Sequence, residues 1–412
     1  MLVWILQTGE PLQIDSGATR PMRAMNLSNK LLKAGHTVVL WSSAFDHQKK
    51  IHRSRNYKVI KVNNNLEIRL LPSNGYKKHM GFGRLVDHAQ MAWNLRKLLK
   101  FEKSIPDVAF IGYPPIETAA IMSEWLKKKN VPTLLDIKDL WPSIFVDVFP
   151  KFLKPFARVL LHPYFYLAKR TMRNVDGISA MSQSFLNWSL SFANKPSSSY
   201  DKIVRLTNEK VKSTDKDLIL ANEFWEKLNV KYETPKVFFT GTFSTGFDFD
   251  QIRIAAEIIK ECQFVLCGHG PCLNETQKLM KDLPNVIFPG WIDKFQLESL
   301  ANMSIASLAP YKNVENFTLN IPNKIVDSLL LGVPILSPLK GEVASIIENN
   351  NVGITYDDNK PLNKCIKSLI DDNRLQKIMS NNARNLYDEK FEFNNIYDSL
   401  IIHLENIVKN NQ

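Results

Sequence analysis

The first half of the chain alternates short apolar runs with longer segments whose apolar residues recur at helical spacing. The run Val3–Leu6 predicts a buried strand, and a helix is predicted from about Pro21 to Lys33, where Gly35 ends it. Strands are also expected at Thr37–Trp41, Val59–Val62, Glu67–Leu71, Val108–Ile111 and Thr133–Asp136, and helices at Leu85–Phe101 and Ile116–Lys129. Alternation of this kind is typical of a parallel, doubly wound sheet.

A second alternating series occupies the other half. The stretch Asn194–Asp215 is rich in serine, lysine and asparagine and predicts a loop, whereas Phe393–Val408 places its apolar residues on one helical face. New strands are expected at Lys236–Thr240, Gln263–Cys267, Val286–Phe288, Met303–Leu308 and Val333–Leu336. We therefore predict a first domain at 1–195, a linker region at 196–235, a second domain at 236–389, and a C-terminal helix, 390–412, that packs back on the first domain.

Composition limits the class of protein. At 412 residues and 44% hydrophobic residues, the chain is long enough for about two domains with a core each. No apolar run approaches the roughly 18 residues that a membrane span needs, and the start lacks the basic region of a signal peptide. The four cysteines have no histidine pair at zinc spacing, so we expect reduced core thiols and no metal site.

The net charge of +12 favours an anionic partner: a nucleic acid, an acidic membrane surface or a phosphorylated substrate. No nucleic-acid-binding motif accompanies the charge, so we expect no nucleic acid. Basic and aromatic residues mix in Phe149–Arg173, as in elements that lie on an anionic bilayer. A core helix with a solvated basic edge explains the same pattern.

The segment Ile321–Glu342 has the most specific chemistry. It predicts a polar loop with Lys324, a short helix with Asp327, a buried strand and a second loop that ends with Glu342. Helix N-termini present unpaired N–H groups and a partial positive charge, so this junction beside a lysine suits a phosphate. The Asp327 carboxylate is placed to accept hydrogen bonds from sugar hydroxyls. A lysine that only faces solvent is the alternative.

Three other loops follow predicted strands of the second domain, and ligands of doubly wound sheets bind at the carboxyl ends of strands. The first loop, Gly241–Gly246, has small residues that let its backbone approach a pyrophosphate. Its hydroxyl donors are Thr242, Ser244 and Thr245. The other two loops are Gly268-His-Gly-Pro271 and the exit of Asn285–Trp291.

In this order, the four segments resemble the donor-nucleotide site of GT-B glycosyltransferases of the large retaining family four. The Pro322-Asn-Lys sequence is similar to a subset of that family that acts on N-acetylated or deoxy amino sugars in bacterial surface polysaccharides. The resemblance implies an α/β protein whose two Rossmann-like domains face a cleft. It also implies a donor site made of Gly241, Thr242, Ser244, Thr245, Gly268, His269, Trp291, Asn323, Asp327 and Glu342.

Two features of the chain depart from the family pattern. The commonest members have paired glutamates eight positions apart, but Leu319 stands eight residues before Asp327. Many members also have arginine and lysine in the first loop, and residues 241–250 contain neither. Lys324 is therefore our leading candidate for neutralising the diphosphate.

The first domain supplies further candidates. The loop with Gly17, followed by Arg20, resembles the loop that faces the donor across the cleft, so Arg20 is a candidate phosphate contact. Residues Asp136–Pro142 resemble the Asp-x-Arg-Asp-Leu-Trp-Pro motif of the same subset, with lysine in place of arginine. Asp139 is then a candidate for orienting an acceptor hydroxyl, and helix capping is its alternative role. We assign no role to His88.

The resemblance implies a cytosolic enzyme, peripherally associated with the inner face of the cell membrane. It would transfer a sugar from a UDP-sugar to a polyprenyl-diphosphate-linked saccharide, in O-antigen or capsule synthesis, with retention. Lys324, Asp139 and Arg20 would be its catalytic residues, and we expect neither a metal nor another cofactor. Two alternatives share the fold: a nucleotide-sugar epimerase, which needs no acceptor, and a catalytically silent membrane adaptor.

Overall fold

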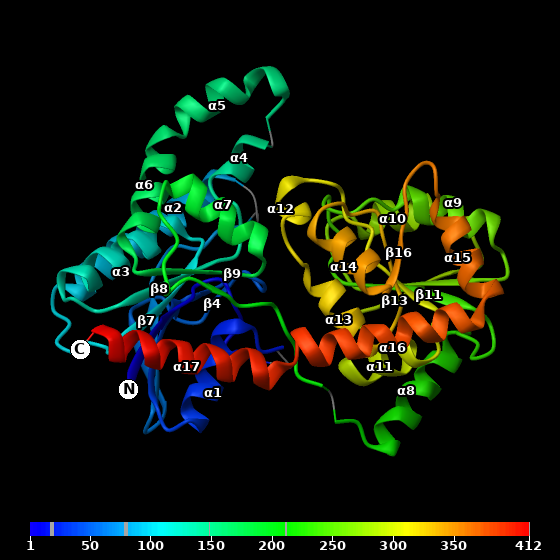
Figure 1. Cartoon of the computed structure of the whole chain (residues 1–412), viewed down its shortest axis with the longest axis horizontal. Coiled ribbons are helices and arrows are strands. Elements are labelled where there is room, and N and C mark those ends of the chain that lie inside the picture. The colour runs from blue at the N-terminus through cyan, green and yellow to red at the C-terminus, as the bar shows by residue number, and fades with distance from the viewer. Residues whose placement is uncertain (17–19, 78–80, 148, 211, 412) are drawn as a thin grey trace. The chain divides into compact units, whose positions relative to one another are not determined.

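The computed structural model describes residues 1–16, 20–77, 81–147, 149–210 and 212–411, which form two compact domains (Figure 1). The first domain comprises Met1–Arg205 and the chain from Asn394 onward, and the second comprises Leu206–Phe393. Both are α/β domains built on a parallel sheet, as the alternating pattern predicted.

The first domain is built on an eight-stranded sheet in the order β10-β9-β8-β7-β1-β2-β6-β5, in which the edge strand β5 is antiparallel to its neighbour and the other pairs are parallel. The strands are β1 (Leu2–Leu6), β2 (Thr37–Ser43), β5 (Lys58–Asn63), β6 (Leu66–Leu71), β7 (Val108–Tyr113), β8 (Thr133–Ile137), β9 (Gly177–Ala180) and β10 (Lys202–Ile203). A separate antiparallel pair joins β3 (Phe45–Asp46) and β4 (Ile51–His52).

The helices of the first domain are α1 (Arg23–Lys33), α2 (Phe82–Leu99), α3 (Ile116–Lys128), α4 (Ser143–Asp147), η1 (Lys151–Leu153), α5 (Lys154–Leu160), α6 (His162–Asn174), α7 (Gln183–Ala193) and α17 (Phe393–Asn411). Helix α17 returns to this domain because it buries its apolar face there, including Leu400 and Leu404. Polar contacts fix its register: His36 Nε2 lies 3.1 Å from a carboxylate oxygen of Glu405.

The second domain has a six-stranded, all-parallel sheet in the order β13-β12-β11-β14-β15-β16. The strands are β11 (Lys236–Thr240), β12 (Gln263–Cys267), β13 (Val286–Gly290), β14 (Ala306–Leu308), β15 (Ile335–Ser337) and β16 (Gly353–Thr355). The helices are α8 (Asp215–Lys227), α9 (Asp250–Ile258), α10 (Leu273–Leu279), α11 (Lys294–Asn302), α12 (Glu315–Thr318), α13 (Asn323–Leu331), α14 (Glu342–Asn350), α15 (Leu362–Asp371) and α16 (Asn373–Lys390).

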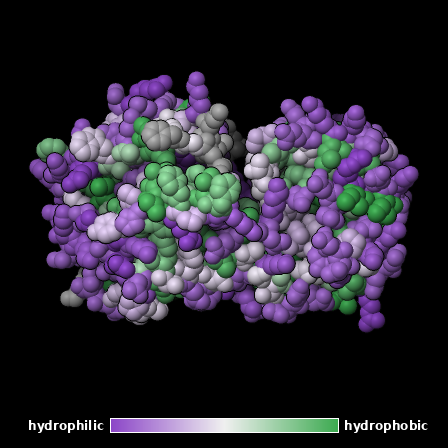
Figure 2. Space-filling view, turned by 90° about the horizontal axis from the view of Figure 1, so that it is seen from above, coloured by the Kyte–Doolittle hydropathy of each residue, from purple (hydrophilic) through white to green (hydrophobic). Residues whose placement is uncertain are grey.

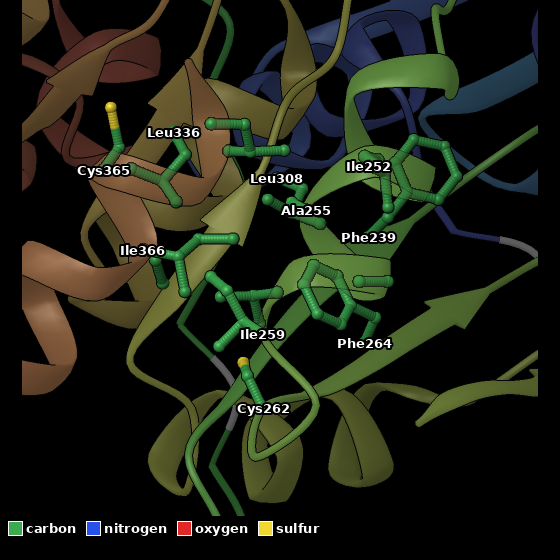
Figure 3. Close-up of a cluster of buried hydrophobic side chains, with 14 of the residues drawn as sticks. Phe239, Ile252, Ala255, Ile259, Cys262, Phe264, Leu308, Leu336, Cys365 and Ile366 are labelled. Atoms are coloured by element: carbon green, nitrogen blue, oxygen red, sulfur yellow. The ribbon is translucent and has the colours of Figure 1, made fainter. Parts of the chain in front are cut away.

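One core of the second domain lies under α9 and α15, where buried apolar side chains from the sheet and both helices meet (Figure 3). Phe239 and Phe264 come from neighbouring strands, and Cys262 and Cys365 lie in the same cluster. Burial raises the pKa of the Cys262 thiol to about 12. The thiols are free, and this one stays protonated near neutral pH, as expected of a core cysteine.

Residues 196–235, which the sequence suggested as a linker region, include ordered elements of both domains. Strand β10 pairs with β9 in the first sheet, and α8 belongs to the second domain. Thr214 and Asp217 form a capping box at the start of α8. The indole of the fully buried Trp225 donates to the carbonyl of Gln296, so α8 is packed against α11.

Within the described residues, no helix is both long and apolar enough to span a bilayer. Nor do the described histidines, cysteines and carboxylates gather in a group that fits a metal ion.

Candidate functional site

Three loops meet at the carboxyl ends of adjacent strands in the second domain. The backbone N–H of Phe243, after β11, donates to the carbonyl of His269, after β12, at 2.9 Å. The N–H of Gly268 donates to the carbonyl of Gly290, at the end of β13, at 2.7 Å. The structure thus brings together the three loops that the sequence singled out, and it places them where ligands of doubly wound sheets bind.

Glycine is required where these loops touch. Gly268 has a φ of +132°, and a methyl group added there would lie 1.8 Å from the carbonyl oxygen of Gly241. Gly270 has a φ of +153°, and its added methyl group would lie 2.3 Å from the carbonyl oxygen of Phe243. A side chain at either position would separate the two backbones, so the close packing of the loops depends on both glycines.

Lys324 lies against the first of these loops. Its half-buried side chain reaches from the first turn of α13 and donates to the carbonyl of Thr240, the last residue of β11. The ammonium also lies 4.6 Å from the ring centre of Phe239 and 4.8 Å from that of Phe247. A methyl group at Gly241 would stand 2.0 Å from Nζ. Packing therefore holds this cation at the glycine loop.

Two helix N-termini follow the glycine loops in the sequence: the start of α13 was predicted, whereas Glu342, at the start of α14, was expected in a loop. Helix α13 begins after Pro322 and α14 after Gly341, and neither of these N-cap residues forms a side-chain capping hydrogen bond. Gly341 has a φ of +69°, and a methyl group there would lie 2.3 Å from the carbonyl oxygen of Thr318. Asn323 is exposed at the first position of α13, and Glu342 is half-buried at the first position of α14.

Asp327, one turn after Lys324, is held by a residue that the sequence did not suggest. The side-chain amide of Asn208 donates to its carboxylate at 2.6 Å. Burial, and then the charge of Asp327, raise the pKa of the buried Tyr311 phenol. Asn208 comes from the first residues of the second domain, 119 positions from its partner, so no local pattern could have revealed the pair.

The other predicted donor-site side chains differ in exposure. Five are exposed: Thr242, Thr245, His269, Trp291 and Asn323. Ser244 is half-buried, and Trp291, immediately after β13, is 70% exposed. An aromatic side chain so accessible at a strand exit is available to stack on a planar ligand. That these residues bind a nucleotide stays a prediction.

A leucine occupies the position of the glutamate that the family pattern leads one to expect. Leu319 directly follows α12 and is half-buried, whereas Glu315 is exposed in the first turn of that helix. The ring of Phe317, also on α12, lies 3.3 Å from the position of a methyl group added to Gly246. The first loop is thus covered on this side by an aromatic ring.

In the first domain, the predicted residues occupy different environments. Arg20 is exposed, Asp139 is half-buried just after β8, and Gly17 lies outside the described residues. The other carboxylate of the motif, Asp136, is fully buried and accepts a hydrogen bond from Ser179 at 2.9 Å. Arg23 lies 3.3 Å from it, so Asp136 belongs to the framework. The roles of Arg20 and Asp139 stay predictions.

The first domain also has a small polar pocket, of about 40 Å³, that the sequence did not reveal. Its wall includes Gly9, after β1, and Pro114, after β7, which are neighbouring strands. Successive connections leave these two strands in opposite directions along the sheet, and ligands of such sheets bind at this switch point. Helix α2 lines the other side with Arg84 and His88.

His88 is the most unusual residue of this polar pocket. It is buried, its Nδ1 has no hydrogen-bond partner among the described residues, and that atom lies 4.0 Å from a carboxylate oxygen of Glu117. Burial, and then the charge of Arg84, lower the pKa of His88 to about 3, so the ring is neutral near neutral pH. The sequence offered one sign of the pocket: polar residues 84, 87 and 88 share a face of α2 with Met91.

Comparison with known proteins agrees with this arrangement. Residues 222–386 match the family model described as "Glycosyl transferases group 1". No curated protein matches the chain. The match covers the glycine loops, Lys324 and both helix N-termini.

Solved structures match over nearly the whole chain. Sucrose-phosphate synthase from Thermosynechococcus elongatus aligns with a TM-score of 0.75 and 14% identity, over 99% of each chain. Anabaena Alr3699/HepE, in complex with UDP and glucose, aligns with a TM-score of 0.67 and 14% identity, over 98% of this chain and 100% of its own. WaaG, a glycosyltransferase involved in lipopolysaccharide biosynthesis, gives 0.66 and 13%, over 97% and 99%. At these identities the likeness establishes the GT-B fold.

Proposed function

We propose that this chain, a glycosyltransferase with the GT-B fold whose second domain belongs to group 1, transfers a sugar from a UDP-sugar to a polyprenyl-diphosphate-linked saccharide. The sugar is an N-acetylated or deoxy amino sugar, the pathway is bacterial surface polysaccharide synthesis (O-antigen or capsule), and the anomeric configuration is retained. Complexes of HepE with UDP support the donor, and the role of WaaG in lipopolysaccharide biosynthesis supports the pathway. The Pro322-Asn-Lys resemblance supports the amino sugar.

The observation that carries the proposal is the position of Lys324 over the loop at Gly241. As the bond between the anomeric carbon and the diphosphate breaks, negative charge grows on the departing oxygen. A positioned cation and the partial positive charge at the start of α13 stabilise that charge more in the transition state than in the bound donor. Arg20 of the first domain is the second proposed phosphate contact.

The rest of the donor follows from the same strand ends. The hydroxyls of Thr242, Ser244 and Thr245 bond the diphosphate beside a loop whose backbone comes close to it. Asp327, held by Asn208, accepts hydrogen bonds from sugar hydroxyls. His269 and Trp291 line the exit where the uracil lies, and Glu342 contacts the transferred sugar.

The transfer needs no protein carboxylate pair of the kind that hydrolases use. The acceptor oxygen forms the new bond to the anomeric carbon, the bond to the diphosphate breaks, and the departing phosphate oxygen takes the acceptor proton. Asp139 orients the acceptor hydroxyl, and the polar pocket of the first domain holds part of the acceptor. In this scheme the protein's own groups meet the charge of the diphosphate, and neither a metal nor another cofactor takes part.

We place the enzyme in the cytoplasm, peripherally on the inner face of the cell membrane, because its proposed acceptor is embedded there. The net charge of +12 supports an anionic membrane surface as a partner, since lipid headgroups attract basic proteins. The net positive charge also suits the nucleotide sugar, which is the second proposed anionic partner. We propose no nucleic-acid partner.

Thermal unfolding with a panel of nucleotide sugars tests the donor, because a ligand that binds the folded state raises the midpoint. We expect UDP-sugars to raise it and GDP-sugars to leave it unchanged. Transfer is then assayed with the best donor and a synthetic polyprenyl-diphosphate saccharide. Stabilisation by no UDP-sugar would contradict the proposal.

A catalytically silent adaptor is the second candidate. Leu319 in place of the family's glutamate, and the lack of basic residues in 241–250, favour it. UDP-sugar binding without transfer to any lipid-linked saccharide would select this candidate. Conversion of the UDP-sugar in the absence of an acceptor would instead identify an epimerase.

A further inference from the structure

Helix α5 turns an apolar face to the solvent. Phe152, just before it, and Phe156, Val159 and Leu160 within it recur at the spacing of one helical face. Their exposed fractions are 79%, 67%, 74% and 65%, whereas Ala157 is the buried residue of the helix. A surface helix of a globular protein normally packs its apolar face against the core, whereas α5 exposes its apolar face to the solvent.

These side chains form one patch rather than scattered exceptions. We call them, together with Phe149, Leu153 and Tyr166, the α5 face. Figure 2 shows hydrophobic side chains gathered on the first domain where α5 crosses its surface. A contiguous apolar patch rimmed by charge marks an interaction site on a folded protein.

The charge around the α5 face has a single sign. From Lys151 to Val175 the sequence has six lysines and arginines and no aspartate or glutamate. Among the described residues, Lys151 and Arg158 are exposed and form no ion pair, whereas Lys154 pairs with Asp147 at 2.7 Å. Aromatic and aliphatic side chains flanked by such cations match the chemistry of an anionic lipid surface, with acyl chains below and phosphates above.

We propose that the α5 face docks the protein on an anionic bilayer by inserting Phe152, Phe156, Val159 and Leu160 at the level of the headgroups. The exposed Lys151 and Arg158, which directly precede Phe152 and Val159 in the chain, contact lipid phosphates. The inference rests on the proposed function only in its purpose, which is to bring the enzyme to a lipid-linked acceptor. Its physical basis is independent of the donor site.

Vesicle co-sedimentation of the full chain tests the docking surface. We expect binding to vesicles of phosphatidylcholine mixed with phosphatidylglycerol, and little binding to phosphatidylcholine alone. The double variant Phe156→Glu/Val159→Glu should bind the mixed vesicles at least about tenfold more weakly, because two apolar anchors become charges that lipid phosphates repel. Phe101→Glu is the matched control: Phe101 is 83% exposed in the same domain but outside the α5 face, and its variant should bind like the parent.

A second pair of changes separates charge from insertion. Lys151→Glu/Arg158→Glu should weaken binding to mixed vesicles about tenfold and flatten its dependence on salt, because each basic residue near the surface adds to the attraction. Equal binding of the parent and the Phe156→Glu/Val159→Glu variant would overturn the proposal. So would a concentration-dependent dimer that this variant abolishes, since the α5 face would then bind a second copy of the chain.

The docking surface and the proposed function fail in different ways. UDP-sugar stabilisation should be the same in the parent and in every α5-face variant, which also shows that the variants are folded. Vesicle binding without any UDP-sugar stabilisation would leave the docking surface intact and reject the function. Transfer to a detergent-solubilised acceptor without selective vesicle binding would leave the proposed function intact and reject the docking surface.

Discussion

Lys324 and Gly241 are coupled by position: a methyl group on Gly241 would stand 2.0 Å from Nζ of Lys324. The residues are 83 positions apart, on α13 and after β11. Gly241 has a φ of +143°, a backbone conformation that side chains disfavour. Because Gly241 has no side chain, the loop can adopt this conformation and the Lys324 ammonium can lie close to it. We expect a diphosphate to bind beside this ammonium and the loop.

Gly241→Ala should weaken UDP binding by at least about tenfold, because the new methyl group strains the loop and displaces the ammonium. Isothermal titration calorimetry with UDP measures the change. Thermal unfolding of the free variant shows whether the domain stays folded. Unchanged affinity in a folded variant would mean that this contact lies outside the donor site.

Gly268→Ala should destabilise the second domain by about 2–4 kcal/mol, since its Cβ would collide with the Gly241 carbonyl at 1.8 Å and its φ is +132°. Urea unfolding followed by circular dichroism measures the loss. Gly9→Ala is the matched control, because no atom of the described residues lies within 4 Å of a Cβ there and φ is outside the unfavourable range. Equal stability of the two variants would refute the close approach of the loops.

His88 predicts a pH dependence of stability. Its pKa in the folded protein is about 3, below the ordinary value of 6.5, so between these values the unfolded chain binds a proton that the folded chain does not. Stability should therefore fall as the pH drops below about 6.5, and His88 should account for about 2 kcal/mol of the loss between pH 7 and pH 5.

The variant His88→Gln removes this titration, so its free energy of unfolding should decline less steeply with acid than that of the parent. Glu117 and Arg84, which face His88, remain in both proteins and their contributions cancel in the comparison. Urea titrations at several pH values provide the slopes. Parallel slopes would show that His88 is protonated alike in the folded and unfolded states.

Much of the fold was predictable because strands and helices of this chain are marked locally. Strands such as Lys236–Thr240 are fully or nearly buried and so have continuous apolar runs, and glycines mark the turns after them. Helix α13 was predictable from its polar start and the glycine at its end, where Gly332 has a φ of +66°. The loops that follow these strands could then be placed together by topology alone.

The rest depends on pairings between distant residues. Asn208 meets Asp327, and His88 faces Glu117, through the tertiary fold alone. The sequence did not predict helix α8, because the capping box at its start, which begins at Thr214, continues the polar stretch that we interpreted as a loop. One sequence cannot reveal such contacts, because neither partner has a local pattern that depends on the other.

The most direct test of the central claim is the affinity for UDP of Lys324→Met, measured by isothermal titration calorimetry beside Lys278→Met. Methionine removes the charge of the lysine but keeps much of the length of its side chain, and Lys278 is an exposed lysine on α10. We predict that Lys324→Met lowers the affinity by about tenfold to a hundredfold, as expected for the loss of a charge-assisted contact, while Lys278→Met binds like the parent. Equal affinity of the parent and both variants would contradict the account.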